Sequence, residues 1–276
     1  MVASIDERLA RQLAKKLKLE NRFKPDLIRF FKQVGRDATA KWAATGRIPN
    51  LNSFQLELIA LLRGHYRRVA KVFAKDARNE VKTVNFFLET KQEENIDSEI
   101  VDYINQHSIQ QSMFILQTTE SNLNVVAASV LAAARTGLER PARAETAREI
   151  RREFDARSVN RVGTIATTET QTTSEAIKFI ESHAVSETLR QTTGQTMLKT
   201  WATLLDEVTR PSHVLADRQE RPINTPFIVQ GERLMVPGDT SLGASVSNII
   251  ECRCASINTI GAAPAGFNPR ERPTLQ

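Results

Sequence analysis

Residues 199–213 read KTWATLLDEVTRPSH, residues 227–239 read FIVQGERLMVPGD, and residues 252–254 read CRC. Alternating side chains over residues 197–204 predict a β-strand, and short β-rich runs on either side of Gln230 and Gly231 predict a β-hairpin. A last strand is expected over residues 248–257. Because strand character occurs only in this part of the chain, we predict an α+β fold. It comprises a mostly helical N-terminal region and a small C-terminal α+β domain with a β-hairpin and a short antiparallel sheet.

The rest of the chain is expected to be helical. Apolar residues at helical spacing predict segments over residues 4–19, 25–44, 53–88, 121–137, 141–157 and 158–183. We predict a helical, basic region over residues 1–150, an α+β domain over residues 155–260 and an irregular tail over residues 261–276.

The predicted helices differ in the width of their apolar faces. In the first helix Leu9, Leu13 and Leu17 form a narrow stripe, so this helix is expected to lean on a partner surface. The next two have broader faces, made of Leu27, Phe30, Phe31, Val34, Ala38 and Trp42, and of Leu58, Leu62, Tyr66, Val69 and Phe73. Five threonines between residues 167 and 173 are poor helix formers, so packing is expected to hold that segment.

The charge of the chain is unevenly distributed. The net charge is +6, but residues 1–95 hold 20 Lys or Arg against 11 Asp or Glu, a local excess of +9. Residues 96–198 carry 10 against 13, and residues 199–276 carry 8 of each sign. The basic excess therefore lies in the N-terminal third, which indicates an acidic partner for that region.

The apolar and cysteine content bears on the cellular compartment. The longest strongly apolar run, residues 125–134, is about half as long as a membrane span, so we expect no membrane association. The two cysteines, Cys252 and Cys254, are separated by one residue, and on a strand such positions are too far apart for easy disulfide formation. A chain without a disulfide framework is typical of a reducing cytoplasm.

Four basic residues at a spacing of four predict a ridge along the third helix: Arg63, Arg67, Lys71 and Lys75. A ridge of this kind can lie along a phosphate backbone. An acidic protein surface is a better-supported partner than DNA, and a ridge of this kind is most often simply a solvated helix face.

The cysteines also allow a metal centre. Cys252 and Cys254 on one strand face, together with His213 and Asp239, could complete the tetrahedral shell that zinc prefers. The alternative is structural: two small buried thiols that pack a strand, with His213 hydrogen-bonded nearby. Apart from zinc, no cofactor is expected.

An enzyme is a further alternative. Arg210 and His213 would share one helix face if a helix starts near residue 209, and Glu169 could then serve as an acid or base. However, the sequence contains no G-x-S-x-G, G-x-x-x-x-G-K or H-E-x-x-H motif. We therefore expect a structural ion network and no catalysis.

The order of these motifs resembles the Mu-F-like phage head morphogenesis family, the minor capsid proteins. The resemblance covers residues 155–258. In the family, a helix with an Ala-Arg-Thr-Glu-Thr-like signature precedes a Lys-x-Trp strand, an Asp, an Arg-x-x-His pair, a hairpin ending in Pro-Gly-Asp, and Asn-Cys-Arg-Cys. The matching residues here are Glu169, Lys199, Trp201, Asp206, Arg210, His213, Gly238, Asp239, Cys252, Arg253 and Cys254.

The chain departs from the family pattern at three places. Thr168 or its neighbour stands where the family has Arg, residues 216–218 read Ala-Asp-Arg in place of Asp-Gly, and Glu251 replaces Asn. The lost glycine predicts a changed turn, and Glu251 changes the polar group beside the cysteines.

The resemblance implies a minor capsid protein of a tailed phage, associated with the portal inside the head. Such a protein is made in the host bacterial cytoplasm and then resides in the virion near the portal vertex. It acts in procapsid assembly, DNA packaging or DNA ejection. Its expected partners are the portal protein and the inner surface of the major capsid protein or scaffold. Double-stranded DNA is a further candidate partner, and the matching residues are expected to form a structural scaffold.

Overall fold

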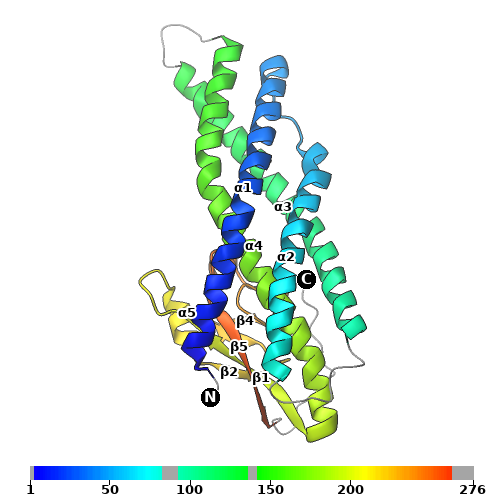
Figure 1. Ribbon diagram of the computed structural model, residues 1–276. Coiled ribbons are helices and arrows are strands. Elements are labelled where there is room, and N and C mark those ends of the chain that lie inside the picture. The colour runs from blue at the N-terminus through cyan, green and yellow to red at the C-terminus, as the bar shows by residue number, and fades with distance from the viewer. Residues whose placement is uncertain (1–2, 83–92, 136–141, 263–276) are drawn as a thin grey trace. The chain divides into compact units, whose positions relative to one another are not determined.

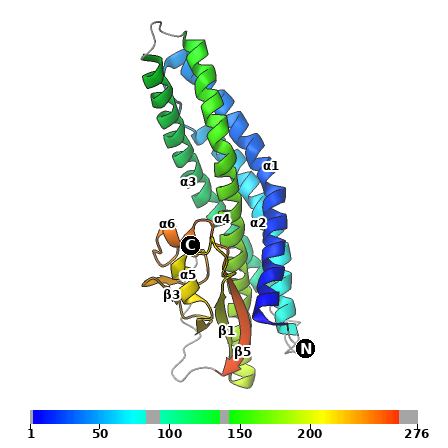
Figure 2. The ribbon, with the colours of Figure 1, turned by 90° about the vertical axis from the view of Figure 1, so that its left-hand side faces the viewer.

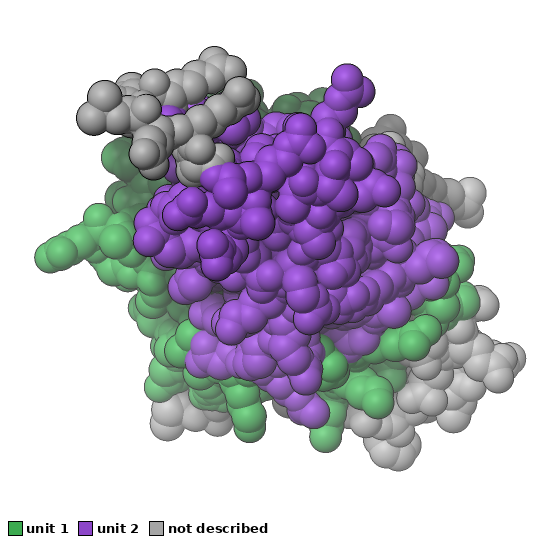
Figure 3. Space-filling model, turned by 90° about the horizontal axis from the view of Figure 1, so that it is seen from above, with its two compact units in different colours: residues 1–20, 66–105, 167–276 green, residues 21–65, 106–166 purple. Residues whose placement is uncertain are grey.

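The computed structural model describes residues 3–82, 93–135 and 142–262 (Figure 1). The chain divides into two compact units (Figure 3). Unit 1 holds residues 1–20, 66–105 and 167–276, and unit 2 holds residues 21–65 and 106–166. None of the described helices combines the length and apolar character that crossing a membrane requires.

Four long helices contribute residues to both units. They are α1 (Ile5–Thr45), α2 (Gln55–Lys82), α3 (Glu93–Arg135) and α4 (Arg143–Thr193), and a short 3-10 turn, η1 (Asn52–Phe54), precedes α2. The predicted domain boundary at residues 150–155 lies within α4.

Several predicted helix boundaries are wrong, because the helices continue through them. Pro25 lies inside α1, where the buried side chains of Phe23 and Leu27 hold the helix on both sides of the proline. Ser121 lies inside α3, where its hydroxyl donates to the carbonyl oxygen of Gln117 instead of capping a helix. The expected boundary at residues 157–158 falls within α4. The predicted boundaries at residues 88, 137 and 141 lie outside the described residues.

The apolar faces predicted for residues 25–44 and 58–73 are confirmed, because every residue named for them is buried. The stripe predicted for the first helix is wrong. Leu9 is buried, but Leu17 is 54% exposed, and Gln12 and Lys16 take buried positions beside Leu9 and Leu19. The hydrogen bonds of these polar side chains, described below, explain the difference.

The C-terminal module, residues 195–262, contains a three-stranded antiparallel sheet in the order β2-β1-β5. Figure 2 shows β1 and β5 side by side. Its strands are β1 (Gln195–Ala202), β2 (Glu220–Pro222) and β5 (Ala255–Ala262), and Trp201 pairs with Ser256. The last strand was predicted to start at residue 248, but β5 starts at Ala255 and continues to Ala262. Residues 246–249 instead form α6 (Val246–Ile249).

The predicted hairpin is confirmed as β3 (Phe227–Val229) and β4 (Glu232–Leu234). Gln230 and Gly231 both have positive φ, 53° and 80°, as a two-residue turn of type I′ requires. The remaining helix of the module is α5 (Pro211–Ala216).

A buried ionic network joins α1, α4 and β5 within unit 1. The Glu175 carboxylate accepts hydrogen bonds from Lys16 at 2.7 Å and from Lys178 at 3.0 Å. It also accepts from the backbone N–H of Ser256 at 2.9 Å, and Lys178 donates to the carbonyl oxygen of Ser256 at 2.6 Å. These side chains therefore occupy the outer edge of β5, where another strand would otherwise pair.

The charge state of Glu175 makes this network sensitive to acid. Burial alone would raise the pKa of Glu175, but the charges of Lys16 and Lys178 and the hydrogen bonds from Lys16 and Ser256 lower it to about 2. A carboxylate with a lowered folded-state pKa contributes stability above its unfolded pKa, and this contribution is lost as the pH falls toward the folded value.

We expect the free energy of unfolding to fall by on the order of 3 kcal/mol as the pH drops from the ordinary glutamate range to about 2. Glu175→Gln should remove most of that dependence. It should also destabilise the protein near neutral pH by about 3 to 5 kcal/mol, because two buried ammonium groups lose their counter-charge. Denaturant unfolding across this pH range measures both effects. Glu207→Gln, at an exposed loop position, is the control; an equal pH response in both variants would contradict the assignment.

A candidate metal centre in the C-terminal module

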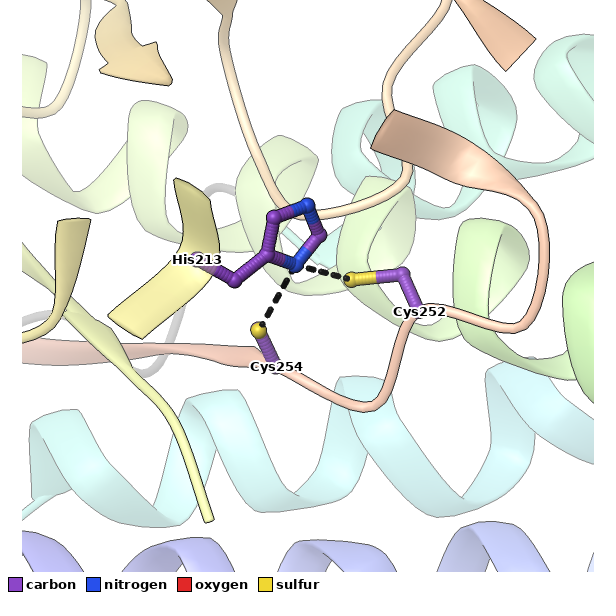
Figure 4. A group of neighbouring side chains, drawn as sticks. All are labelled: His213, Cys252 and Cys254. Atoms are coloured by element: carbon purple, nitrogen blue, oxygen red, sulfur yellow. Dashed lines mark hydrogen bonds between the residues drawn. The ribbon is translucent and has the colours of Figure 1, made fainter. Parts of the chain in front are cut away.

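Three potential metal ligands converge in the C-terminal module (Figure 4). The Nδ1 atom of His213 lies 3.3 Å from the Sγ atom of Cys254 and 3.8 Å from that of Cys252. All three ligand atoms lie within 4.8 Å of one another, and the three residues are buried. Two thiols and an imidazole at this separation form a group that could hold a metal ion.

The N-terminus of α5 places His213 next to the two cysteines. Arg210 has an extended conformation at the N-cap of α5, and Pro211 occupies the first helical position, which suits its fixed φ. One turn later the His213 ring meets the Trp201 ring edge to face, with centroids 5.5 Å apart. The apolar surroundings come from a buried cluster of Trp201, Ala216, Phe227, Val229, Leu234, Cys252 and Cys254.

The cysteines lie between α6 and β5, so the prediction that they share a strand face is wrong. They converge through the irregular backbone before the strand. Glu251 has a positive φ of 53°, and its N–H donates to the hydroxyl of Thr168 on α4. The carbonyl oxygen of Cys254 accepts a hydrogen bond of 2.7 Å from the side chain of Gln171 on the same helix.

The predicted packing of the threonine segment is confirmed in these contacts. Thr170 and Thr173 are fully buried, and Thr172 donates to the carbonyl oxygen of Gly238. Thr168, Gln171 and Thr172 hydrogen-bond to loop backbone and so fix the loops of the module to one stretch of α4.

A hydrogen bond between Nε2 of His213 and Asn248 orients the imidazole ring. Nε2 lies 3.3 Å from the Oδ1 atom of Asn248, and Asn248 donates in turn to the Glu232 carboxylate at 2.7 Å. Because an amide oxygen accepts hydrogen bonds, Nε2 carries a proton, and in the neutral imidazole Nδ1 then has a lone pair available for a metal ion. Metal-binding histidines are commonly oriented by an outer partner of this kind, so the donor set fits a metal ion.

The two thiols differ in their acidity. Hydrogen bonding with Cys252 and then with His213 and Thr203 lowers the pKa of Cys254 to about 5, against the effect of burial. Hydrogen bonding with Cys254, followed by burial, raises the pKa of Cys252 well above its ordinary value. The two thiols therefore titrate as one coupled pair, in which Cys254 is the more acidic member.

The fourth predicted ligand, Asp239, does not join the group. One of its carboxylate oxygens accepts from the N–H of Met235 at 2.7 Å, and the other accepts from the N–H of Ser241 at 2.8 Å. Gly238 precedes it with a φ of 87°, which glycine adopts without strain. Asp239 therefore stabilises the turn that follows β4, and the prediction that it is a ligand is wrong.

The other motif residues make structural contacts around the group. The buried ammonium group of Lys199 donates to the carbonyl oxygen of Met235 at 2.5 Å and lies 5.0 Å from the centroid of the Phe227 ring. Burial holds its pKa well below the ordinary value, against the effect of Asp239. Arg253 pairs with Asp206 at 2.8 Å. Arg210 donates to the carbonyl oxygen of Ile250.

The three residues of the enzyme alternative are not brought together. Glu169 is buried and accepts a hydrogen bond from the hydroxyl of Tyr66. Arg210 and His213 line a small cavity, and Glu169 is not among its lining residues.

The residues predicted to form a basic ridge have different environments. Arg67, Lys71 and Lys75 are exposed on the part of α2 that belongs to unit 1. Arg63, in unit 2, is half-buried and donates to the hydroxyl of Ser108 at 3.1 Å. Arg63 therefore has a packing role within unit 2.

Sequence reasoning missed two groups of residues. Asn248 and Glu232, which orient His213, were placed only within a strand and a hairpin. Lys16, Glu175 and Lys178 were not singled out at all. The sequence shows only that these three charged residues fall at helix positions where an apolar side chain would be expected. Charged residues are usually exposed to solvent, so this pattern did not indicate burial.

Comparisons of the chain with models of protein families, with curated proteins and with solved structures found no match.

Proposed function

We propose that this chain is a minor capsid protein of a tailed phage that acts in head morphogenesis from a position near the portal. The observation that supports the proposal is the convergence of the motif residues. Lys199, Trp201, His213, Cys252 and Cys254 are separated by as many as 55 positions, and all lie in one buried module. Because these motif residues pack together in one scaffold, we infer that their role is structural and not catalytic.

We propose further that the centre formed by His213, Cys252 and Cys254 binds zinc. Its donors are one imidazole nitrogen and two sulfurs, a mixture that zinc accepts. The Nδ1 atom of His213 already faces both sulfur atoms, so little rearrangement of these side chains is needed. A bound ion would connect α5 to the start of β5 and would stabilise the module.

A second candidate function is binding of double-stranded DNA. In unit 1 an ion pair of 2.6 Å between Lys15 and Asp76 holds α1 beside α2. Five further exposed basic residues lie on these two helical segments: Arg11, Lys18, Arg67, Lys71 and Lys75. This basic surface is broader than a ridge on one helix, and several phosphates could be neutralised at once.

The capsid proposal predicts that the chain is present in assembled heads, in few copies, near the portal vertex. A reconstruction of particles computed without icosahedral averaging at that vertex locates it. Trp201→Ala should lower its incorporation, because loss of this buried side chain destabilises the module by about 3 to 5 kcal/mol. Absence from virions, or an even distribution over the shell, would refute the proposal.

The zinc proposal predicts close to one zinc ion per chain in protein purified without chelator. Elemental analysis should show that His213→Ala, Cys252→Ser and Cys254→Ser each lower the zinc content strongly. Asp239→Asn is the matched control, because this carboxylate lies in the turn after β4 and the variant should keep its zinc. A folded wild-type protein without metal would rule the centre out.

The DNA proposal predicts a salt-dependent affinity for duplex DNA. Changing Arg67, Lys71 and Lys75 together to Ala should reduce the slope of log K against log salt by about 2 to 3, since each lost phosphate contact removes about 0.9. Lys41→Ala, at an exposed position of α1 in unit 2, is the control and should leave the slope nearly unchanged. Equal slopes in all three proteins would remove DNA as a partner of this surface.

A further inference from the structure

The metal centre has fewer protein ligands than zinc usually takes. A tetrahedral shell has four positions, and the centre supplies one nitrogen and two sulfurs. The sequence contains no third cysteine. Among the residues that the structure describes, no other histidine or carboxylate joins the group, and both oxygens of Asp239 are used in its turn. The fourth ligand must therefore come from outside this group.

A small cavity lies beside two of the three ligands. Its volume is about 20 Å³, and both His213 and Cys254 line it. A site of this size accommodates a single water molecule, and it opens toward solvent beside the exposed residues Leu204, Glu251 and Arg253, so a linear anion bound end-on can extend out of it. The hydroxyl of Thr203 also lines the cavity and lies 3.4 Å from the Sγ atom of Cys254, so the wall offers a polar contact.

Charged groups at the cavity wall act on any ligand that enters it. A zinc ion with two thiolates has no net charge, so the centre itself does not repel one. Arg253 is neutralised by its ion pair with Asp206, whereas Arg210 donates to a neutral carbonyl oxygen and keeps its full positive charge. Arg210 therefore offers a positive charge to an incoming anion, and the carboxylate of Glu251 at the same wall acts against it.

We infer that the metal of this centre carries three protein ligands and one exchangeable ligand in the cavity, a water molecule that a small anion can replace. The inference rests on the zinc centre proposed above and goes beyond a structural cross-link. Structural zinc sites are usually closed by four protein ligands, whereas sites that bind small molecules keep one position open.

Cobalt-substituted full-length protein provides the test, with sodium azide as the probe. The near-ultraviolet thiolate-to-cobalt absorption reports that the metal is bound, and the visible bands report its coordination. Azide should shift the visible bands to a saturating end point while the thiolate absorption is retained. Visible bands that do not respond to azide would overturn the inference and leave the metal centre intact. Absence of the thiolate absorption would refute the metal centre itself, so the two failures are distinguishable.

Two variants identify the groups at the cavity. Glu251 lines it and is the rival source of a fourth ligand. Glu251→Gln should leave the azide-free cobalt spectrum unchanged, and a changed spectrum would overturn the inference. Arg210→Gln should raise the Kd for azide by roughly tenfold, and Arg210→Lys should restore most of the affinity. Arg233→Gln, which changes an exposed guanidinium that is not among the lining residues, is the matched control and should leave the Kd unchanged.

Discussion

The carboxylate of Glu175 is the constraint on which unit 1 depends. It is fully buried and accepts hydrogen bonds from Lys16 and Lys178 and from the backbone and hydroxyl of Ser256. An unpaired charge at this depth would cost several kcal/mol, so these partners stay in contact as long as the unit is folded. One ion thus ties the first turns of α1, the second half of α4 and the outer edge of β5 together. The edge of the sheet is closed by side chains in place of a further strand.

Gln171 connects the ionic network around Glu175 to the candidate metal centre. Its side-chain oxygen accepts from Lys16, and its amide nitrogen donates to the carbonyl oxygen of Cys254. Lys16 therefore connects the ionic network to the segment that carries the cysteines. The threonine-rich stretch of α4 does not favour a helix by propensity, and its hydroxyl groups instead hold the loops of the module. The position of Cys254 is set by tertiary contacts of α4 as much as by the strand that follows it.

Sequence patterns predicted some elements well and others poorly. The hairpin was recovered because Gln230 and Gly231 form a local turn signal, and the buried faces of α1 and α2 were recovered because apolar periodicity is strong there. Helix ends were misplaced because Pro25 and Ser121 are local signals that packing overrides. For the centre, His213, Cys252 and Cys254 were named correctly as a group. Asp239 was assigned to it on donor chemistry alone, without knowledge of the turn that uses both its oxygens.

The sequence by itself determined the α+β class, the hairpin, the broad apolar faces of α1 and α2, the basic excess near the N-terminus and three of the four residues proposed as metal ligands. These properties follow from local periodicity and composition, which do not depend on distant contacts. Only the tertiary structure decided that Lys16 and Glu175 are buried partners, that Asn248 orients His213, and that two cysteines outside a strand meet one imidazole nitrogen. Each of these contacts joins residues at least 35 positions apart, and no local pattern specifies such a pairing.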